Sequence, residues 1–104
     1  MSELIVNGRP IPYETVPVSY MADSMRNYFE HGISPGSFGA ALLCNDLRET
    51  FGRADDTNGR HIRAWVQWLY DNAPAGSWGS RENFMEWMES RRMESRQPKE
   101  TTNG

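Results

Sequence analysis

The feature that most constrains the fold is one amphipathic stretch between two turn signals, from Pro35 to Gly52. Pro35 cannot continue a preceding helix, and Gly52 is typical of the left-handed position that follows a helix end. At about 100° per residue, one apolar stripe runs along this stretch: Ala40, Leu43, Cys44, Leu47 and Phe51. Further apolar side chains lie on a second face of the same predicted helix: Phe38, Ala41 and Leu42. The pattern predicts a helix over residues 37–51 that is covered from two sides, at the centre of a bundle.

Three more segments have helical periodicity: residues 18–31, residues 58–72 and a segment that follows residue 80. Gly32 ends the first, Pro74 stops the second, and Ser80 caps the third. Their apolar positions recur at i, i+3 and i+4: Val18, Met21, Met25, Tyr28 and Phe29 in 18–31; Ile62, Trp65, Val66, Leu69 and Tyr70 in 58–72; Phe84, Trp87 and Met88 after residue 80. The sequence therefore predicts a mainly α fold, a compact bundle of about four short helices.

The N-terminal residues favour two structures equally. Asn7-Gly8 is a strong signal for a type I′ hairpin, but Pro10 and Pro12 remove two backbone donors from its second arm, which leaves an extended arm as the alternative. After residue 92 the sequence is polar and has no apolar period. We therefore divide the chain into an arm or hairpin (1–17), a helical domain (18–92) and a disordered tail (93–104).

Length and charge restrict the class of protein. With 104 residues the chain is expected to form one domain, and a net charge of −3 does not favour general binding to nucleic acid. The longest apolar run, residues 40–44, is far short of the roughly 20 residues of a membrane span, and we expect neither a membrane anchor nor a signal segment. Cys44 is the one cysteine, and its place on an apolar face predicts a reduced core thiol.

Four short motifs carry a resemblance to a known family. They are HGISPGSF at residues 31–38, NDL at 45–47, RAD at 53–55 and APAGSWGS at 73–80. With this order and spacing, the chain resembles a family of small proteins carried by tailed bacteriophages, over roughly residues 20–88. Ser34 stands where that family usually has a proline. The resemblance implies a phage origin and a location in the cytoplasm of a bacterial host, and it implies no catalytic mechanism.

The first candidate site is the turn that leads into the central helix. Free backbone amides at a helix N-terminus suit an anion, and an arginine brought near by the fold would complete the site. The residues predicted for this site are Gly36, Ser37 and Phe38, with Arg26 or Arg53. A Pro-Gly-Ser turn is also an ordinary helix entry, so the pattern leaves both interpretations open.

The polar pair Asn45-Asp46 interrupts the apolar central helix. Both residue types are poor helix formers, so we expect buried hydrogen bonds from them to loop backbone, with the loop that contains Trp78 as the candidate. Asp46 with His31 or His61 would be the obvious acid–base pair, but no nucleophile motif accompanies it. No pair of histidines or cysteines has metal-ligand spacing, and the sequence indicates no cofactor and no enzyme.

The second candidate site is a face of the third predicted helix that carries arginines and an aromatic residue. Arginine and tryptophan dominate the energetics of protein interfaces, so this face is a candidate partner surface: Arg60, Arg63, Gln67 and Trp68. The alternative is a solvated face with Trp68 buried against the fourth helix.

Three functions fit these features. The first is a non-enzymatic phage accessory protein that binds a bacterial host or defence protein. The second is a small-ligand binder for a nucleotide or another anion, built around residues 35–38. The third is a DNA-binding regulator with a helix-turn-helix, which the overall acidity disfavours. The sequence leaves open whether the chain forms a homodimer.

Overall fold

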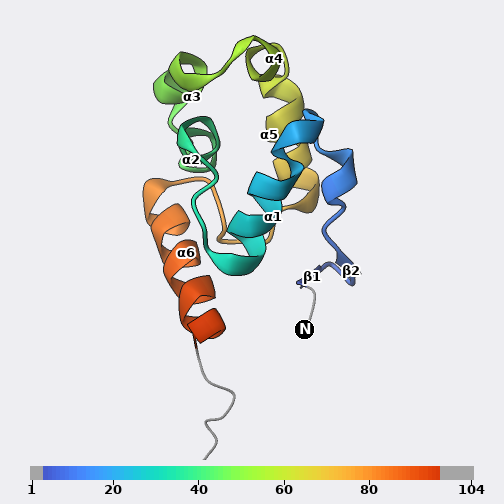
Figure 1. The fold of residues 1–104 in the computed structure, drawn as a ribbon, viewed down its shortest axis with the longest axis vertical. Coiled ribbons are helices and arrows are strands. Elements are labelled where there is room, and N and C mark those ends of the chain that lie inside the picture. The colour runs from blue at the N-terminus through green and yellow to red at the C-terminus, as the bar shows by residue number, and fades with distance from the viewer. Residues whose placement is uncertain (1–3, 97–104) are drawn as a thin grey trace, which may run out of the picture.

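The computed structural model describes residues 4–96, and the fold is mainly helical (Figure 1). A hairpin of β1 (Ile5–Val6) and β2 (Arg9–Pro10) is followed by short 3-10 helices at Tyr13–Thr15 and Ser19–Met21. Within the described range six α-helices follow: α1 (Ala22–His31), α2 (Ser37–Leu43), α3 (Leu47–Arg53), α4 (Asp56–Gly59), α5 (Ile62–Asn72) and α6 (Arg81–Arg96). None of the helices in residues 4–96 is long and apolar enough to cross a membrane.

The hairpin alternative for the N-terminal residues is confirmed. The two strands are antiparallel, with Ile5 opposite Pro10 and Val6 opposite Arg9. Asn7 and Gly8 have φ angles of 54° and 83°, which is the pair of left-handed conformations that a type I′ turn requires. At the other end of the chain, α6 continues past residue 92 to Arg96, and residues 97–104 of the predicted tail lie outside the described residues.

The expectation of about four helices needs a correction, because two of the predicted helices are each divided in two. The central helix, predicted over residues 37–51, ends at Leu43 and starts again at Leu47. The helix predicted over residues 58–72 is α4 followed by α5, with a break at Arg60 and His61. As a result only the first part of the predicted central stripe is buried: Leu43 is fully buried, whereas Leu47 is 71% exposed and Phe51 is 57% exposed.

The centre of the core belongs to α1, not to α2 and α3. Figure 1 shows α1 between α5 and α6. Tyr28 of α1 is fully buried, its ring stacks on that of Phe84 in α6 with centroids 5.2 Å apart, and its hydroxyl donates to the carbonyl of Ser77 at 2.6 Å. The indole of Trp87 donates to the carbonyl of Phe29 at 3.2 Å and fastens α6 to α1. The largest fully buried side chains are Trp65, Tyr28, Phe29, Met25, Leu43 and Leu69.

Candidate functional site

The corner between α2 and α3 determines which side chains reach the surface. Asn45 has a φ of 61°, the amide of Asn45 donates to the carbonyl of Leu42 at 3.1 Å, and the amide of Asp46 donates to the carbonyl of Ala41 at 3.0 Å. These two bonds and the left-handed residue form a Schellman motif, which ends α2. The carboxylate of Asp46 then accepts from the amide of Glu49 at 3.1 Å and caps α3.

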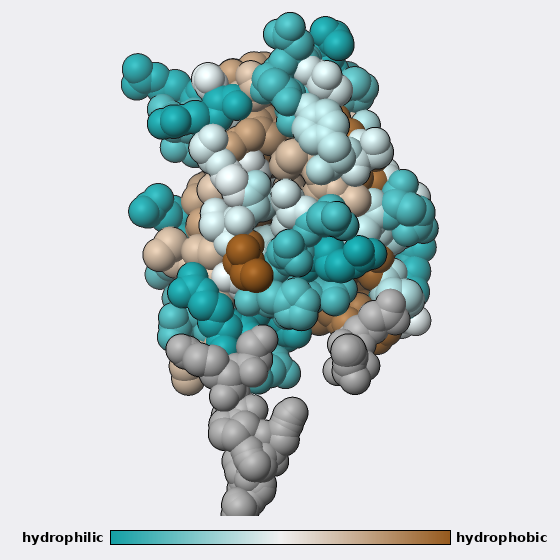
Figure 2. Space-filling model, viewed as in Figure 1, coloured by the Kyte–Doolittle hydropathy of each residue, from teal (hydrophilic) through white to brown (hydrophobic). Residues whose placement is uncertain are grey.

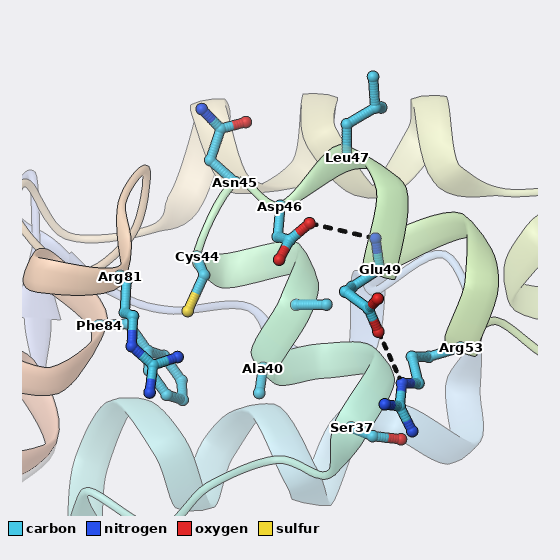
Figure 3. Close-up of a pocket in the computed structure, with 11 residues that line it drawn as sticks. Ser37, Ala40, Cys44, Asn45, Asp46, Leu47, Glu49, Arg53, Arg81 and Phe84 are labelled. Carbon is cyan, nitrogen blue, oxygen red and sulfur yellow. Dashed lines mark hydrogen bonds and ion pairs between the residues drawn. The ribbon is translucent and has the colours of Figure 1, made fainter.

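This geometry corrects the interpretation of Asn45-Asp46 as a buried polar pair inside one helix. Both side chains are exposed, and both residues serve to end one helix and begin the next. The Trp78 loop does contact α2, but through the backbone, because the amide of Gly79 donates to the carbonyl of Leu43 at 2.8 Å. Figure 3 shows Asn45 and Leu47 pointing away from the side of the corner that holds Cys44, Glu49 and Arg53.

On one side of the corner lies an open hollow of about 610 Å³ between α2, α3 and α6. Its polar side chains come from these three helices and from the corner between α2 and α3: Ser37, Cys44, Asn45, Asp46, Glu49, Arg53 and Arg81. The guanidinium of Arg53 is already paired with the carboxylate of Glu49 at 2.9 Å (Figure 3). Burial raises the pKa of the Cys44 thiol, and the nearby Arg81 opposes that rise only in part. The hollow contains no histidine among its lining residues, so the acid–base pair considered for Asp46 is not formed here.

The structure brings only part of the predicted anion site together. Ser37 and Arg53 line the same hollow, and Gly36, with a φ of 95°, is the residue that precedes α2. Phe38, however, is buried in the core, and Arg26 lies elsewhere, with its guanidinium 4.8 Å from the centre of the Tyr13 ring. Of the two arginines that the sequence offered as alternatives, Arg53 therefore lies with Ser37 and Arg26 does not.

On the other side of the corner, an apolar groove of about 410 Å³ runs between the α2–α3 corner and α5. Its floor is formed by buried or half-buried side chains: Leu42, Thr50, Ile62, Val66 and Trp78. Asn45 and Leu47 line both the groove and the charged hollow, so they form the ridge that separates the two. We refer to this feature as the α3–α5 groove.

Large apolar side chains stand at the edge of the α3–α5 groove. Leu47 is 71% exposed, and Tyr70 on the opposite wall is 74% exposed. Phe51, one turn after Leu47 on α3, is 57% exposed but is not among the residues that line the groove. Tyr70 is held in place by an edge-to-face contact with Trp78, with ring centroids 5.2 Å apart. Figure 2 shows brown and pale surface between teal groups at the end of the molecule where α3, α4 and α5 meet.

No protein-family model, curated protein or solved structure matches this chain. Among residues 4–96, no group of three or more histidine, cysteine, aspartate or glutamate side chains is placed to hold a metal ion. The candidate site is therefore described by its own geometry alone.

The predicted partner surface on the third helix is divided by the structure. Arg60, Arg63 and Gln67 are exposed, but Trp68 is 6% exposed, and its indole donates to the hydroxyl of Thr15 at 2.9 Å. Trp68 is thus buried, as in the alternative interpretation: its indole closes the core between α5 and the first 3-10 helix, so it is not available as an interface anchor. Arg63 lies one turn before Val66, which lines the α3–α5 groove, but Arg63 is not itself among the residues that line it.

The residues that sequence reasoning missed are Leu47, Phe51 and Tyr70. They were assigned to the core because they fit a helical stripe. The signal that could have placed Leu47 and Phe51 at the surface was the pair Asn45-Asp46, since asparagine tolerates the left-handed conformation after a helix and aspartate is a preferred N-cap.

Proposed function

We propose that this chain is a small non-enzymatic accessory protein of the kind carried by tailed bacteriophages, and that it binds a bacterial host or defence protein through the α3–α5 groove. The observation that carries the proposal is the exposure of Leu47 and Tyr70 on the two sides of an apolar floor. Burying one such side chain in a partner is worth about 1.5–3 kcal/mol. The phage-like motifs in the sequence support the choice of a bacterial partner and the host cytoplasm as its location.

The groove suits a protein segment better than a small polar ligand. The side chains that line it are mainly aliphatic and aromatic, and Thr50 and Asn45 add polar groups. A nucleotide or another anion would instead favour the charged hollow, where Arg53 is already engaged by Glu49. We therefore place protein binding first and ligand binding second.

Comparative purification tests the proposal. The unmodified chain, a Leu47→Asp variant and an Ile33→Asp variant are expressed in the bacterial host and recovered under identical conditions. Ile33 is a matched control because it is apolar, 53% exposed and not part of the α3–α5 groove. We expect one stoichiometric partner with the unmodified chain and with Ile33→Asp, and loss of that partner with Leu47→Asp. Equal recovery by all three proteins, or by none, would contradict the proposal.

A further inference from the structure

The charged hollow between α2, α3 and α6 contains one closed ion pair and two further charged residues. Its volume of about 610 Å³ lies within the range of about 300–1,000 Å³ that is typical of small-molecule sites. Arg53 and Glu49 form the ion pair at 2.9 Å. The other two charged residues are Arg81, at the start of α6, and Asp46, at the corner before α3. The charges that are open to a ligand therefore belong to Arg81 and Asp46.

Arg81 has no partner of opposite charge in the described part of the chain. The ion pairs found within residues 4–96 involve Arg26, Arg53 and Arg91, and the side chain of Arg81 makes no hydrogen bond there. Arg81 is also exposed. The guanidinium donors of Arg81 are thus free to meet an acceptor on a ligand.

Asp46 has one carboxylate oxygen to spare. Its Oδ1 accepts from the amide of Glu49 at 3.1 Å and caps α3, whereas its Oδ2 accepts no hydrogen bond from any residue in the described range. Asp46 and Arg81 form no ion pair with each other, although both line the hollow and both act on the pKa of the Cys44 thiol, in opposite directions. Figure 3 shows Cys44 between them. One free cationic group and one free anionic group therefore line the same space and stay apart.

The hollow also has an apolar part. Ala40 and Ala41 on α2, together with Phe84 on α6, line it and are buried or half-buried. Cys44 adds a small side chain without charge, because burial raises the pKa of its thiol. A hydrocarbon group can therefore pack in the hollow beside the two opposite charges.

We infer that the charged hollow binds a small zwitterion of the amino-acid class with an apolar side chain, whose carboxylate pairs with Arg81 and whose ammonium pairs with Asp46. A guanidinium holds a carboxylate through two parallel N–H donors, and an ammonium donates to a carboxylate oxygen. The apolar side chain of the ligand packs on Ala40, Ala41 and Phe84. This inference does not rest on the binding of a partner protein in the α3–α5 groove.

A simple anion such as phosphate fits the hollow less well. The charged residues that line it are two arginines and two carboxylates, so their charges sum to zero. An anion on Arg81 would be repelled by the free oxygen of Asp46, because like charges at short range cost free energy. A zwitterion instead satisfies both residues and adds no net charge to the hollow.

Three probes with the same aromatic group test the inference. At neutral pH, phenylalanine carries both charges, phenylpropanoate carries the carboxylate without the ammonium, and phenylethylamine carries the ammonium without the carboxylate. Two-dimensional NMR of the isotope-labelled chain follows the amide signals of Ala40, Ala41 and Cys44, which lie in the hollow. The shifts give a dissociation constant for each probe.

Two variants each remove one of the open charges. Arg81→Gln removes the cation, and Asp46→Asn removes the anion while asparagine keeps the cap on α3. Arg63→Gln and Asp23→Asn are the matched controls, because they make the same changes at exposed residues that do not line the hollow. Circular dichroism verifies that each variant is folded.

We expect phenylalanine to bind at least about threefold more tightly than either probe with a single charge, since an exposed ion pair contributes only a small factor. On Arg81→Gln, phenylalanine binds no better than phenylethylamine, because its carboxylate has lost its partner. On Asp46→Asn, it binds no better than phenylpropanoate. The two control variants keep the full preference for the zwitterion.

Three other outcomes would overturn the inference. Equal binding of phenylalanine and phenylpropanoate, together with binding of inorganic phosphate, would assign the hollow to simple anions. An equal loss of preference in the control variants would show that the net charge of the chain, and not Arg81 and Asp46, selects the probe. The third outcome is that none of the probes shifts the three amide signals. The proposed function is decided separately, by the comparative purification.

Discussion

The indole of Trp65 donates a 2.9 Å hydrogen bond to the side-chain oxygen of Asn58, and both residues are buried. The bond joins α4 to α5 across the break at residues 60 and 61. α5 forms one wall of the α3–α5 groove, and α4 follows α3, which forms the other. The bond therefore fixes the α5 wall relative to α4.

Replacing Asn58 tests the importance of this bond. Asn58→Ala leaves the indole N–H of Trp65 buried without its acceptor, so we expect a loss of about 1–3 kcal/mol in the free energy of unfolding. Urea denaturation followed by tryptophan fluorescence measures the change. Asn27→Ala is the control, because Asn27 is exposed on α1 and alanine favours a helix. Equal stability of the two variants would show that the bond contributes nothing.

Substitution of Asp46 tests the corner between α2 and α3. Asp46→Ala removes the cap on the amide of Glu49, and we expect it to lower the free energy of unfolding by about 1 kcal/mol. If one helix continued through residues 45 and 46, the same change would instead raise helix content and stability, because alanine is the better helix former. Thermal denaturation followed by circular dichroism distinguishes the two signs.

Gly32 is the position where a side chain is least tolerated. Its φ is 71°, and a Cβ there would lie 2.5 Å from the carbonyl oxygen of Met88 in α6. We expect Gly32→Ala to cost about 1–3 kcal/mol from the backbone conformation alone, with the close approach to α6 adding to that cost. Gly52→Ala, in the exposed face of α3 where a Cβ meets nothing within 4 Å, is expected to stabilise the fold. An equal fall of the melting temperature in Gly32→Ala and Gly52→Ala would contradict the difference that we expect between the two positions.

Asp55 gives the stability of the chain a predictable dependence on pH. Its carboxylate accepts from the hydroxyl of Tyr20 and from the amide of Asn58, and these bonds hold the pKa of Asp55 below its ordinary value of 3.8. A lowered pKa in the folded chain means that the ionised form adds stability above pH 3.8, and that this stability is lost as the pH falls through the folded value.

The variant Asp55→Asn isolates this effect, since asparagine still caps a helix but does not titrate. We expect a lower urea midpoint than that of the unmodified chain at pH 7, and a gap that narrows as the pH falls below 3.8. A gap that is independent of pH would show that the charge of Asp55 has no part in it.

Much of the fold was predictable because its signals are local. Asn7-Gly8 predicts the turn, Gly32 predicts the end of α1, and Ser80 predicts the start of α6, where its hydroxyl accepts from the amide of Asn83 at 3.0 Å. Each of these residues meets a requirement of the backbone at its own position, so no tertiary contact is needed to identify it.

The innermost element was less predictable because helical stripes do not reveal how many sides of a helix are covered. Leu43 and Leu47 belong to one stripe, yet the corner at Asn45 buries the first and exposes the second. Trp68 lies off the stripe of α5 and is nevertheless buried, because the first 3-10 helix covers it from outside the bundle. The groove depends on the first effect, because the corner at Asn45 brings Leu47 to its edge, and for that reason its sequence signal was hidden among core positions.

The most direct measurement of the central claim is a two-dimensional NMR titration of the isotope-labelled chain with the partner protein recovered by comparative purification. If that partner binds in the α3–α5 groove, the amide signals of Leu47, Thr50, Val66 and Gly79 shift with increasing partner concentration, and those of the α1–α6 contact do not. Shifts confined to residues outside the groove, or no shifts at all, would contradict the claim.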